Sequence, residues 1–170
     1  MTEPLDLALL NEAEPSAFAA ALAPLFEGAP RFLSRLAAGR PDPDWQSLFA
    51  RARAIAQTMP ENEQIELINA HPRLGASPGA VSAHSFREQG YDREAPAEAR
   101  ETTELERLNA AYEARFGFRY CVYVAGRSRA ALMPEMAASS EATRDVEMRR
   151  ALDAVVDIAA ARWSTIGGPG

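Results

Sequence analysis

The stretch "FRYCVYVAG", residues 118–126, decides the fold class because it is the one strand-like run in the sequence. It is rich in aromatic and β-branched residues and ends on a glycine. The other segments between turn signals have apolar residues three and four positions apart, which is the pattern of a helix. A single extended run cannot form a sheet. The sequence therefore predicts an all-α fold in which residues 118–126 are a short strand or a stretched connector.

Prolines and capping residues indicate where several helices begin and end. The segment "PENEQIELINAHP", residues 60–72, predicts a helix that ends near His71, because Pro72 disfavours the α conformation of the residue before it. An upstream helix is expected to begin at Asp42, a residue type that favours the N-cap, and to run toward Thr58.

Two longer helices are expected, besides shorter ones over residues 15–28, 30–39, 82–92 and 128–139. One covers "PAEARETTELERLNAAYEARFG", residues 96–117, and is terminated by Gly117. The other covers residues 140–163 near the end of the chain. We expect one domain over residues 1–170, built as an irregular orthogonal bundle of about eight helices.

Composition excludes several classes of function. The chain has 170 residues, of which 47% are apolar and 25% charged, so it can bury a proper core. The net charge of −6 argues against nucleic-acid binding, and no apolar run approaches the ~20 residues of a membrane span. Cys121 is the single cysteine and lies in an apolar run, which is typical of a buried, inert thiol in a reducing compartment. The expected location is the cytoplasm.

His71 is the first candidate for chemistry. It lies at the C-terminus of a predicted helix, where the backbone carbonyls favour the imidazolium form. An unperturbed histidine titrates near pH ~6.5, and Pro72 restricts the backbone beside it. A rigid, titratable group that faces a loop can act as a general acid or base. The alternative is that His71 only caps the helix.

The segment "SAHSFREQ", residues 82–89, offers two registers. In the first, Ser85 and Glu88 form a capping box and have no other role. In the second, Ser82 caps the helix, and a hydroxyl, a carboxylate and an amide share one helix face at Ser85, Glu88 and Gln89. The spacing alone does not choose between them.

Two further interpretations stay open. His84 and Glu88 are four residues apart, and with His71 they could form the metal site of a hydrolase, although the sequence has no His-Glu-x-x-His pattern. A non-catalytic helical interaction domain is another alternative.

Arg162, among alanines and beside Trp163, could bind an anion with its planar fork or form an intramolecular salt bridge.

Several motifs, in this order, resemble a known family. They are "LINAHPRLG" (67–75), "SFREQG" (85–90), "LNAAYEARFGF" (108–118), "GRS" (126–128) and "IAAAR" (158–162). Together they resemble the 2-oxo-4-hydroxy-4-carboxy-5-ureidoimidazoline (OHCU) decarboxylases, which act on the last intermediate between uric acid and (S)-allantoin. The resemblance runs from about Leu10 to Ile166.

The resemblance implies an all-helical fold, usually a homodimer, that decarboxylates this small molecule and needs no cofactor; we expect no metal either. It implies that His71 is the catalytic acid or base, and that Glu88 bonds the substrate hydroxyl or polarises His71. It places Pro72, Ser85 and Gln89 in the substrate pocket and assigns the grip on the substrate to Arg162. Backbone groups of one segment are expected to contact the ring: Phe116, Gly117, Phe118, Arg119, Tyr120, Cys121 and Val122. Arg119 departs from the pattern, since many relatives have proline there.

Overall fold

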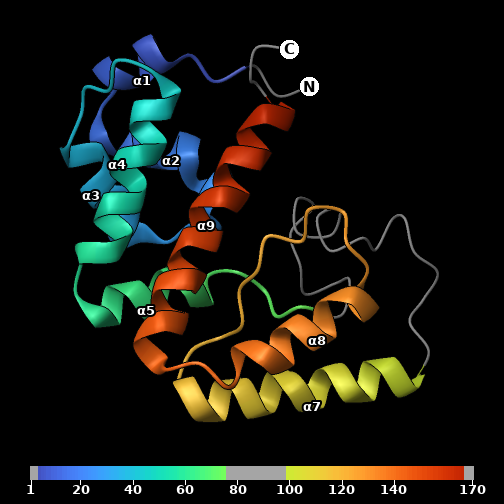
Figure 1. Cartoon of the computed structure of the whole chain (residues 1–170). Helices are drawn as coiled ribbons and strands as arrows, with labels where there is room; N and C mark the ends of the chain where they lie inside the picture. Colours follow the sequence, from blue (N-terminus) through green and yellow to red (C-terminus); the bar gives the residue numbers. More distant parts are fainter. Residues whose placement is uncertain (1–3, 76–98, 167–170) are drawn as a thin grey trace. The chain divides into compact units, whose positions relative to one another are not determined.

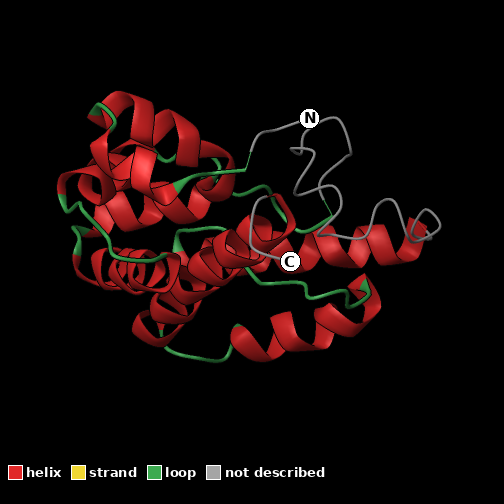
Figure 2. Cartoon of the chain, turned by 90° about the horizontal axis from the view of Figure 1, so that it is seen from above, coloured by secondary structure: helices red, strands yellow, loops and turns green. Residues whose placement is uncertain are grey.

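A computed structural model describes residues 4–75 and 99–166 of the chain. The described residues form eight helices and contain no strand, which confirms the prediction of an all-α fold (Figures 1 and 2). None of the helices in these two ranges is long and apolar enough to span a bilayer. The predicted helix around residues 82–89 lies outside the described residues.

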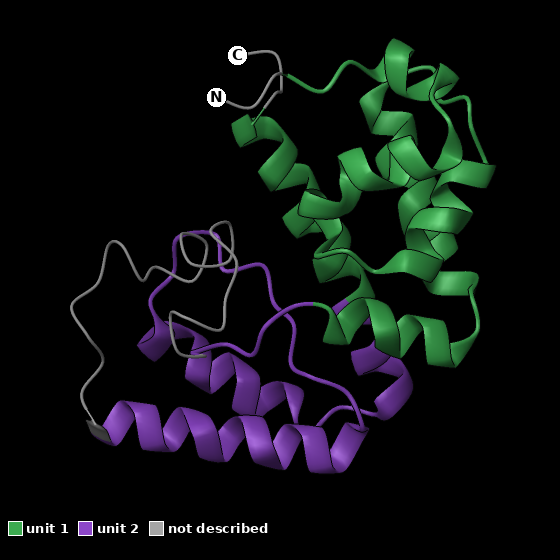
Figure 3. Cartoon of the chain, turned by 180° about the vertical axis from the view of Figure 1, so that it is seen from behind, with its two compact units in different colours: residues 1–70, 152–170 green, residues 71–151 purple. Residues whose placement is uncertain are grey.

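The chain groups into two compact units, which are coloured separately in Figure 3. Unit 1 consists of residues 1–70 and 152–170, and unit 2 consists of residues 71–151. Helix α9 (Arg144–Ile166) contributes residues to both. The expectation of one domain over the whole chain stays a prediction.

Unit 1 contains five helices and the C-terminal part of α9. Their bounds are α1 (Leu7–Glu12), α2 (Pro15–Phe26), α3 (Pro30–Ala38), α4 (Trp45–Thr58) and α5 (Glu61–Asn69). α2 and α3 are joined by a short turn and pack closely, with the rings of Phe26 and Phe32 4.9 Å apart. Fully buried side chains on α2, α3 and α4 form the core of this unit: Phe18, Leu22, Leu25, Phe26, Phe32, Leu36 and Leu48.

Two helix starts in unit 1 differ from the sequence-based expectation. The N-cap of α4 is Asp44, whose carboxylate accepts a hydrogen bond of 2.7 Å from the amide of Ser47. The expectation of Asp42 as the cap was wrong, because Asp42 is buried and pairs with both Nε and Nη2 of Arg51. The sequence also gave no expectation of α1, whose N-cap Asp6 accepts hydrogen bonds from two backbone amides.

Unit 2 contains α7 (Ala99–Phe116), α8 (Arg129–Ser139) and the first two turns of α9. Gly117 ends α7 with φ +80°, a left-handed conformation that glycine adopts without strain. The chain then continues as an extended connector without a strand partner, which agrees with the second of the two expectations for residues 118–126. Phe118 and Tyr120 turn inward and pack against Tyr112 with ring separations of 5.9 and 5.1 Å, whereas Tyr123 is exposed.

Candidate active site

His71 directly follows Ala70, the C-cap residue of α5, as the position of Pro72 predicts. The histidine is 5% exposed, while Pro72 is half-buried. The backbone carbonyl of His71 accepts a hydrogen bond of 3.2 Å from Nη1 of Arg119 in the extended connector. A side chain from the connector is therefore bonded to the backbone of the candidate acid or base.

The loop that follows His71 lies along one face of α7. Glu113 binds the side chain of Arg73, with Nε to oxygen distances of 2.8 and 3.0 Å. One turn earlier on α7, Nδ2 of the buried Asn109 donates a hydrogen bond of 3.0 Å to the carbonyl of Leu74. One turn earlier again, Leu105 packs so closely on Gly75 that a Cβ there would lie 2.3 Å from its Cδ2.

These contacts give the loop and α7 a fixed register. Leu105, Asn109 and Glu113 are spaced by four residues and so share one helix face. They contact three successive loop residues in the opposite chain direction. Residues 73–75 of the "HPRLG" motif therefore meet every fourth residue along one face of α7 within unit 2.

Segment 116–122 covers the last residue of α7 and the first part of the connector, and most of its side chains are buried or half-buried. Phe116, Phe118, Tyr120 and Cys121 are buried. The carbonyl of Phe116 accepts a hydrogen bond of 2.9 Å from Arg144, and the carbonyl of Cys121 accepts one of 2.9 Å from Arg150. Two arginines of α9 thus fix both ends of the segment whose backbone is expected to contact the substrate.

A buried ionic cluster supports this segment and was not found from the sequence. Glu147 is 1% exposed, accepts a hydrogen bond of 2.6 Å from Tyr112 and is bound by Nε and Nη2 of Arg150. Burial and the neighbouring Glu147 raise the pKa of Tyr112. Burial also raises the pKa of Tyr120 to about 12, against the opposing charge of Arg150, which lies 4.9 Å from its ring centroid. The i,i+3 spacing of Glu147 and Arg150 was the only available signal in the sequence.

Arg162 lies in unit 1 and has intramolecular partners. It is 2% exposed, and its Nη2 donates a hydrogen bond of 2.8 Å to Glu27. Its Nη1 donates to the carbonyls of Pro24 and Leu25 at the C-terminus of α2. The salt bridge that the sequence left open is therefore present. The expected substrate contact of Arg162 stays a prediction.

Four residues singled out in the sequence lie outside the described residues: His84, Ser85, Glu88 and Gln89. The proposed convergence of a hydroxyl, a carboxylate and an amide therefore stays a prediction, and so does the metal alternative. Within residues 4–75 and 99–166, no group of three or more potential ligands could hold a metal ion.

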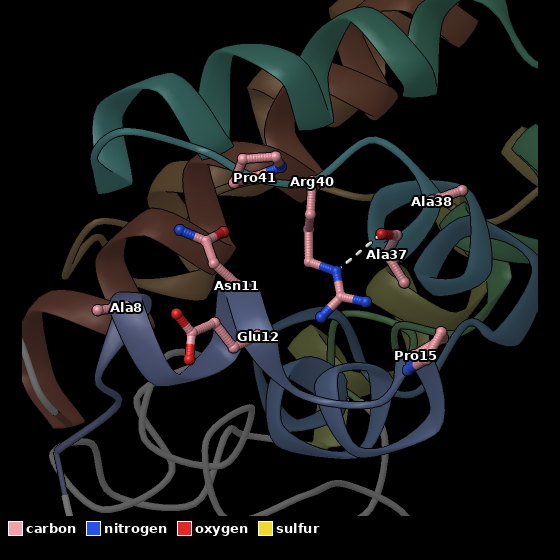
Figure 4. A pocket seen from close by; sticks show the side chains of 8 residues that line it. All are labelled: Ala8, Asn11, Glu12, Pro15, Ala37, Ala38, Arg40 and Pro41. Atoms are coloured by element: carbon pink, nitrogen blue, oxygen red, sulfur yellow. Dashed lines mark hydrogen bonds between the residues drawn. The ribbon is translucent and has the colours of Figure 1, made fainter.

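Unit 1 has an open surface hollow of about 690 Å³, which Figure 4 shows with its eight lining residues. Arg40 points into it, but its guanidinium donates hydrogen bonds to the carbonyls of Leu10, Ala13 and Ala37 and lies over the ring of Phe18. The arginine therefore acts as a clamp on the ends of α1 and α3. None of the candidate residues from the sequence lines this hollow.

Comparison with solved structures first defines the class of fold. The crystal structure of OHCU decarboxylase in the presence of (S)-allantoin matches 90% of this chain and 97% of its own, with a TM-score of 0.68 and 19% identity. The crystal structure of (S)-allantoin synthase matches 97% of this chain and 54% of its own, with a TM-score of 0.73 and 19% identity. These likenesses establish that the chain shares their helical fold.

Sequence comparison then gives the family. The family model for OHCU decarboxylase matches residues 11–164, a range that includes residues of both units. The chain belongs to the OHCU decarboxylase family.

Individual relatives agree with this assignment. The chain is 30% identical over 157 residues to the uric acid degradation bifunctional protein PucL of Bacillus subtilis, covering 92% of this chain and 32% of that protein. It is 25% identical to the 2-oxo-4-hydroxy-4-carboxy-5-ureidoimidazoline decarboxylase of Haloferax volcanii, covering 93% and 94% of the two chains. The chain spans about a third of the length of the bifunctional Bacillus relatives.

Proposed function

We propose that this chain decarboxylates 2-oxo-4-hydroxy-4-carboxy-5-ureidoimidazoline to (S)-allantoin in urate degradation, without a cofactor. The observation that carries the proposal is the family match over residues 11–164, which includes both His71 and Arg162. The names of the relatives support it, since they describe uric acid degradation and decarboxylation of this compound.

The reaction requires positioning of the substrate and the net uptake of one proton in place of carbon dioxide. The carboxyl and hydroxyl groups of the substrate share ring carbon 4, and the ureido group is on carbon 5. The bond from carbon 4 to the carboxylate breaks, carbon dioxide leaves, and the electron pair moves into the adjacent unsaturated carbon–nitrogen system. A proton is then added to carbon 5 and another to the ring nitrogen, while the hydroxyl on carbon 4 loses its proton and becomes a carbonyl, so that one proton is taken up overall. Delivery of the proton to a single face gives a single enantiomer of allantoin.

His71 is the proposed proton carrier. Its side chain is buried, its backbone carbonyl is bonded by Arg119, and the loop after it is packed against α7. A general acid or base needs this kind of restriction, because proton transfer depends on hydrogen-bond distance and direction. Glu88 is proposed to bond the substrate hydroxyl or to polarise His71, while Ser85, Gln89 and Pro72 are proposed to line the pocket.

Arg162 is the proposed anchor for the carboxylate or ureido end of the substrate, which suits a planar guanidinium fork. Its present partners are Glu27 and two carbonyls of α2. Substrate contact therefore requires that the guanidinium serve the substrate beside these partners or in place of one of them. The ring itself is proposed to lie against the backbone of residues 116–122.

A homodimer and a cytoplasmic location belong to the same proposal. The dimer is inferred from the family resemblance, and the location from the single, buried cysteine. Light scattering after size-exclusion chromatography tests the dimer directly, because a monomer elutes with a mass of 18.4 kDa.

The decisive experiment generates the unstable substrate in situ from urate with the two preceding enzymatic activities. The optical activity of allantoin is then followed with and without the purified protein. We expect faster formation of allantoin and an excess of the S enantiomer, both unchanged after treatment with a chelator. Racemic allantoin formed at the spontaneous rate contradicts the proposed function, and decarboxylation that a chelator abolishes contradicts its independence of a metal or cofactor.

A further inference from the structure

Arg119 occupies a distinctive position between two parts of unit 2. Its Nη1 donates a hydrogen bond of 3.2 Å to the carbonyl of His71, and its Nε lies 3.9 Å from Oε1 of Glu113. Glu113 in turn binds Arg73, two residues after the histidine. The guanidinium therefore links the connector after α7 to the loop that carries the candidate acid or base.

The hydrogen bond acts on a backbone group whose direction controls the histidine. The carbonyl of His71 belongs to the planar peptide unit that joins it to Pro72. Because the proline ring fixes its own φ, the remaining freedom near this peptide lies largely in ψ of His71. A donor that holds the carbonyl restricts ψ, and this in turn restricts the direction of the Cα–Cβ bond and the imidazole.

The ion pair contributes less than the hydrogen bond. The side chain of Arg119 is 35% exposed, and its distance of 3.9 Å from Glu113 is at the limit of a salt bridge. Pairs of this kind contribute little to stability. Asn109 holds the carbonyl of Leu74, and Glu113 lies one turn after it on α7. The carboxylate of Glu113 therefore keeps the guanidinium of Arg119 near the loop that follows His71.

We propose that the side chain of Arg119 positions His71: it acts through the backbone carbonyl of the histidine and does not itself touch the substrate. The inference rests on the catalytic role proposed for His71 and deepens it. A proline at position 119 would stiffen the connector but has no side-chain donor. In this chain, a hydrogen bond between the connector and the loop after α5 constrains both segments.

The kinetic test compares two matched substitutions. Arg119→Met removes the donors but keeps a long side chain, and Arg107→Met makes the same change at an exposed arginine that pairs with Glu104 on α7. We expect Arg119→Met to lower kcat by about 10- to 100-fold with little change in KM, because small misplacements of a reacting group have large effects on rate. Arg119→Lys, which retains a donor, should recover part of the loss, and Arg107→Met should behave as wild type.

Two kinetic outcomes overturn the inference. An unchanged kcat in Arg119→Met shows that the bond is dispensable. A rise in KM alone shows that Arg119 binds the substrate itself. Circular dichroism and Tm are measured on every variant, so that a loss of kcat is compared only among folded proteins.

A spectroscopic test does not depend on activity. The chain has two histidines, so His84→Asn leaves His71 as the single imidazole in a long-range ¹H–¹⁵N spectrum. Adding Arg119→Met should shift or broaden the His71 signals, whereas adding Arg107→Met should not. An unchanged spectrum refutes the positioning role even in an active enzyme. If the wild-type protein has no decarboxylase activity but Arg119→Met still shifts the His71 signals, the proposed function is refuted and the positioning role remains supported.

Discussion

The hydroxyl of Tyr112 donates a hydrogen bond of 2.6 Å to Oε2 of Glu147, and both residues are buried in unit 2. Glu147 also receives two hydrogen bonds from Nε and one from Nη2 of Arg150, whose Nη1 holds the carbonyl of Cys121. One carboxylate therefore organises the contact between α7, α9 and the connector. The stability of unit 2 and the placement of the connector backbone depend on the same cluster.

We expect Tyr112→Phe to lower the free energy of unfolding by about 2 kcal/mol, because it removes a buried hydrogen bond to a charged acceptor. Urea denaturation followed by circular dichroism measures this change. Tyr123→Phe is the matched control, since Tyr123 is 37% exposed and should change stability by less than about 0.5 kcal/mol. Equal effects of the two substitutions would contradict the role of the cluster.

Stability should fall in alkaline solution because of Tyr120. Burial raises the pKa of this phenol to about 12 in the folded chain, against about 10 for an unfolded tyrosine. The contribution to stability is therefore complete below about pH 10 and is lost as the pH rises through about 12. Tyr120→Phe should make the decline between about pH 10 and about pH 12 shallower in urea titrations. A decline of the same steepness in both proteins would show that other groups cause it.

Gly75→Ala tests the register between the loop and α7. Gly75 has φ +77°, and a Cβ would lie 2.3 Å from Cδ2 of Leu105. Gly28→Ala is the control, since Gly28 has φ +80° but no atom within 4 Å of the added Cβ. Both variants incur about 1–2 kcal/mol for the left-handed backbone, and Gly75→Ala should lose at least about 1 kcal/mol more through the clash. Equal losses of unfolding free energy in the two variants would mean that the Leu105 side chain moves aside at no energetic cost.

His71→Asn should reduce decarboxylation by at least about 10²-fold, since a positioned general acid or base contributes about that much. The helical circular dichroism signal should remain. Under the proposed function, His84→Asn should retain activity, whereas loss of activity in both variants, together with inhibition by a chelator, would favour the metal hydrolase. Near-normal activity of His71→Asn would remove the assignment of this histidine.

Arg162 can be tested by separating its two roles. Arg162→Lys removes the planar fork and should raise KM by at least about 10-fold. Glu27→Gln leaves the guanidinium in place but removes its carboxylate partner, so it should lower Tm while KM changes less than about 3-fold. If both variants lower Tm and neither changes KM, the arginine has only the structural role that the salt bridge describes.

The sequence predicted helix ends where one residue decides the backbone. The end of α5 predicted from Pro72 lies within two residues of the observed end, and α7 ends before Gly117 as predicted. The start of α4 was misplaced because Asp42 and Asp44 both satisfy the local capping preference. Arg51 decides between them by pairing with Asp42, and that pairing depends on the folded arrangement.

The candidate site was predictable only in part for a similar reason. The motifs indicated which residues matter, and the helix period placed Leu105, Asn109 and Glu113 on one face. The pairing of that face with the loop after His71, and of Arg119 with the histidine carbonyl, joins segments about 35 to 50 residues apart. Such pairings depend on tertiary packing, which local propensities do not specify.

Helix α9 limits where the chain can be interrupted or exchanged. Its first turns hold the carbonyls of the connector through Arg144 and Arg150, and its later turns hold the end of α2 through Arg162. A chain break within this helix would separate the arginines that hold the connector from the arginine that holds the end of α2. Insertion of another protein should therefore be tolerated only outside α9. A chimera between homologues should fold only where the whole of α9 comes from one parent.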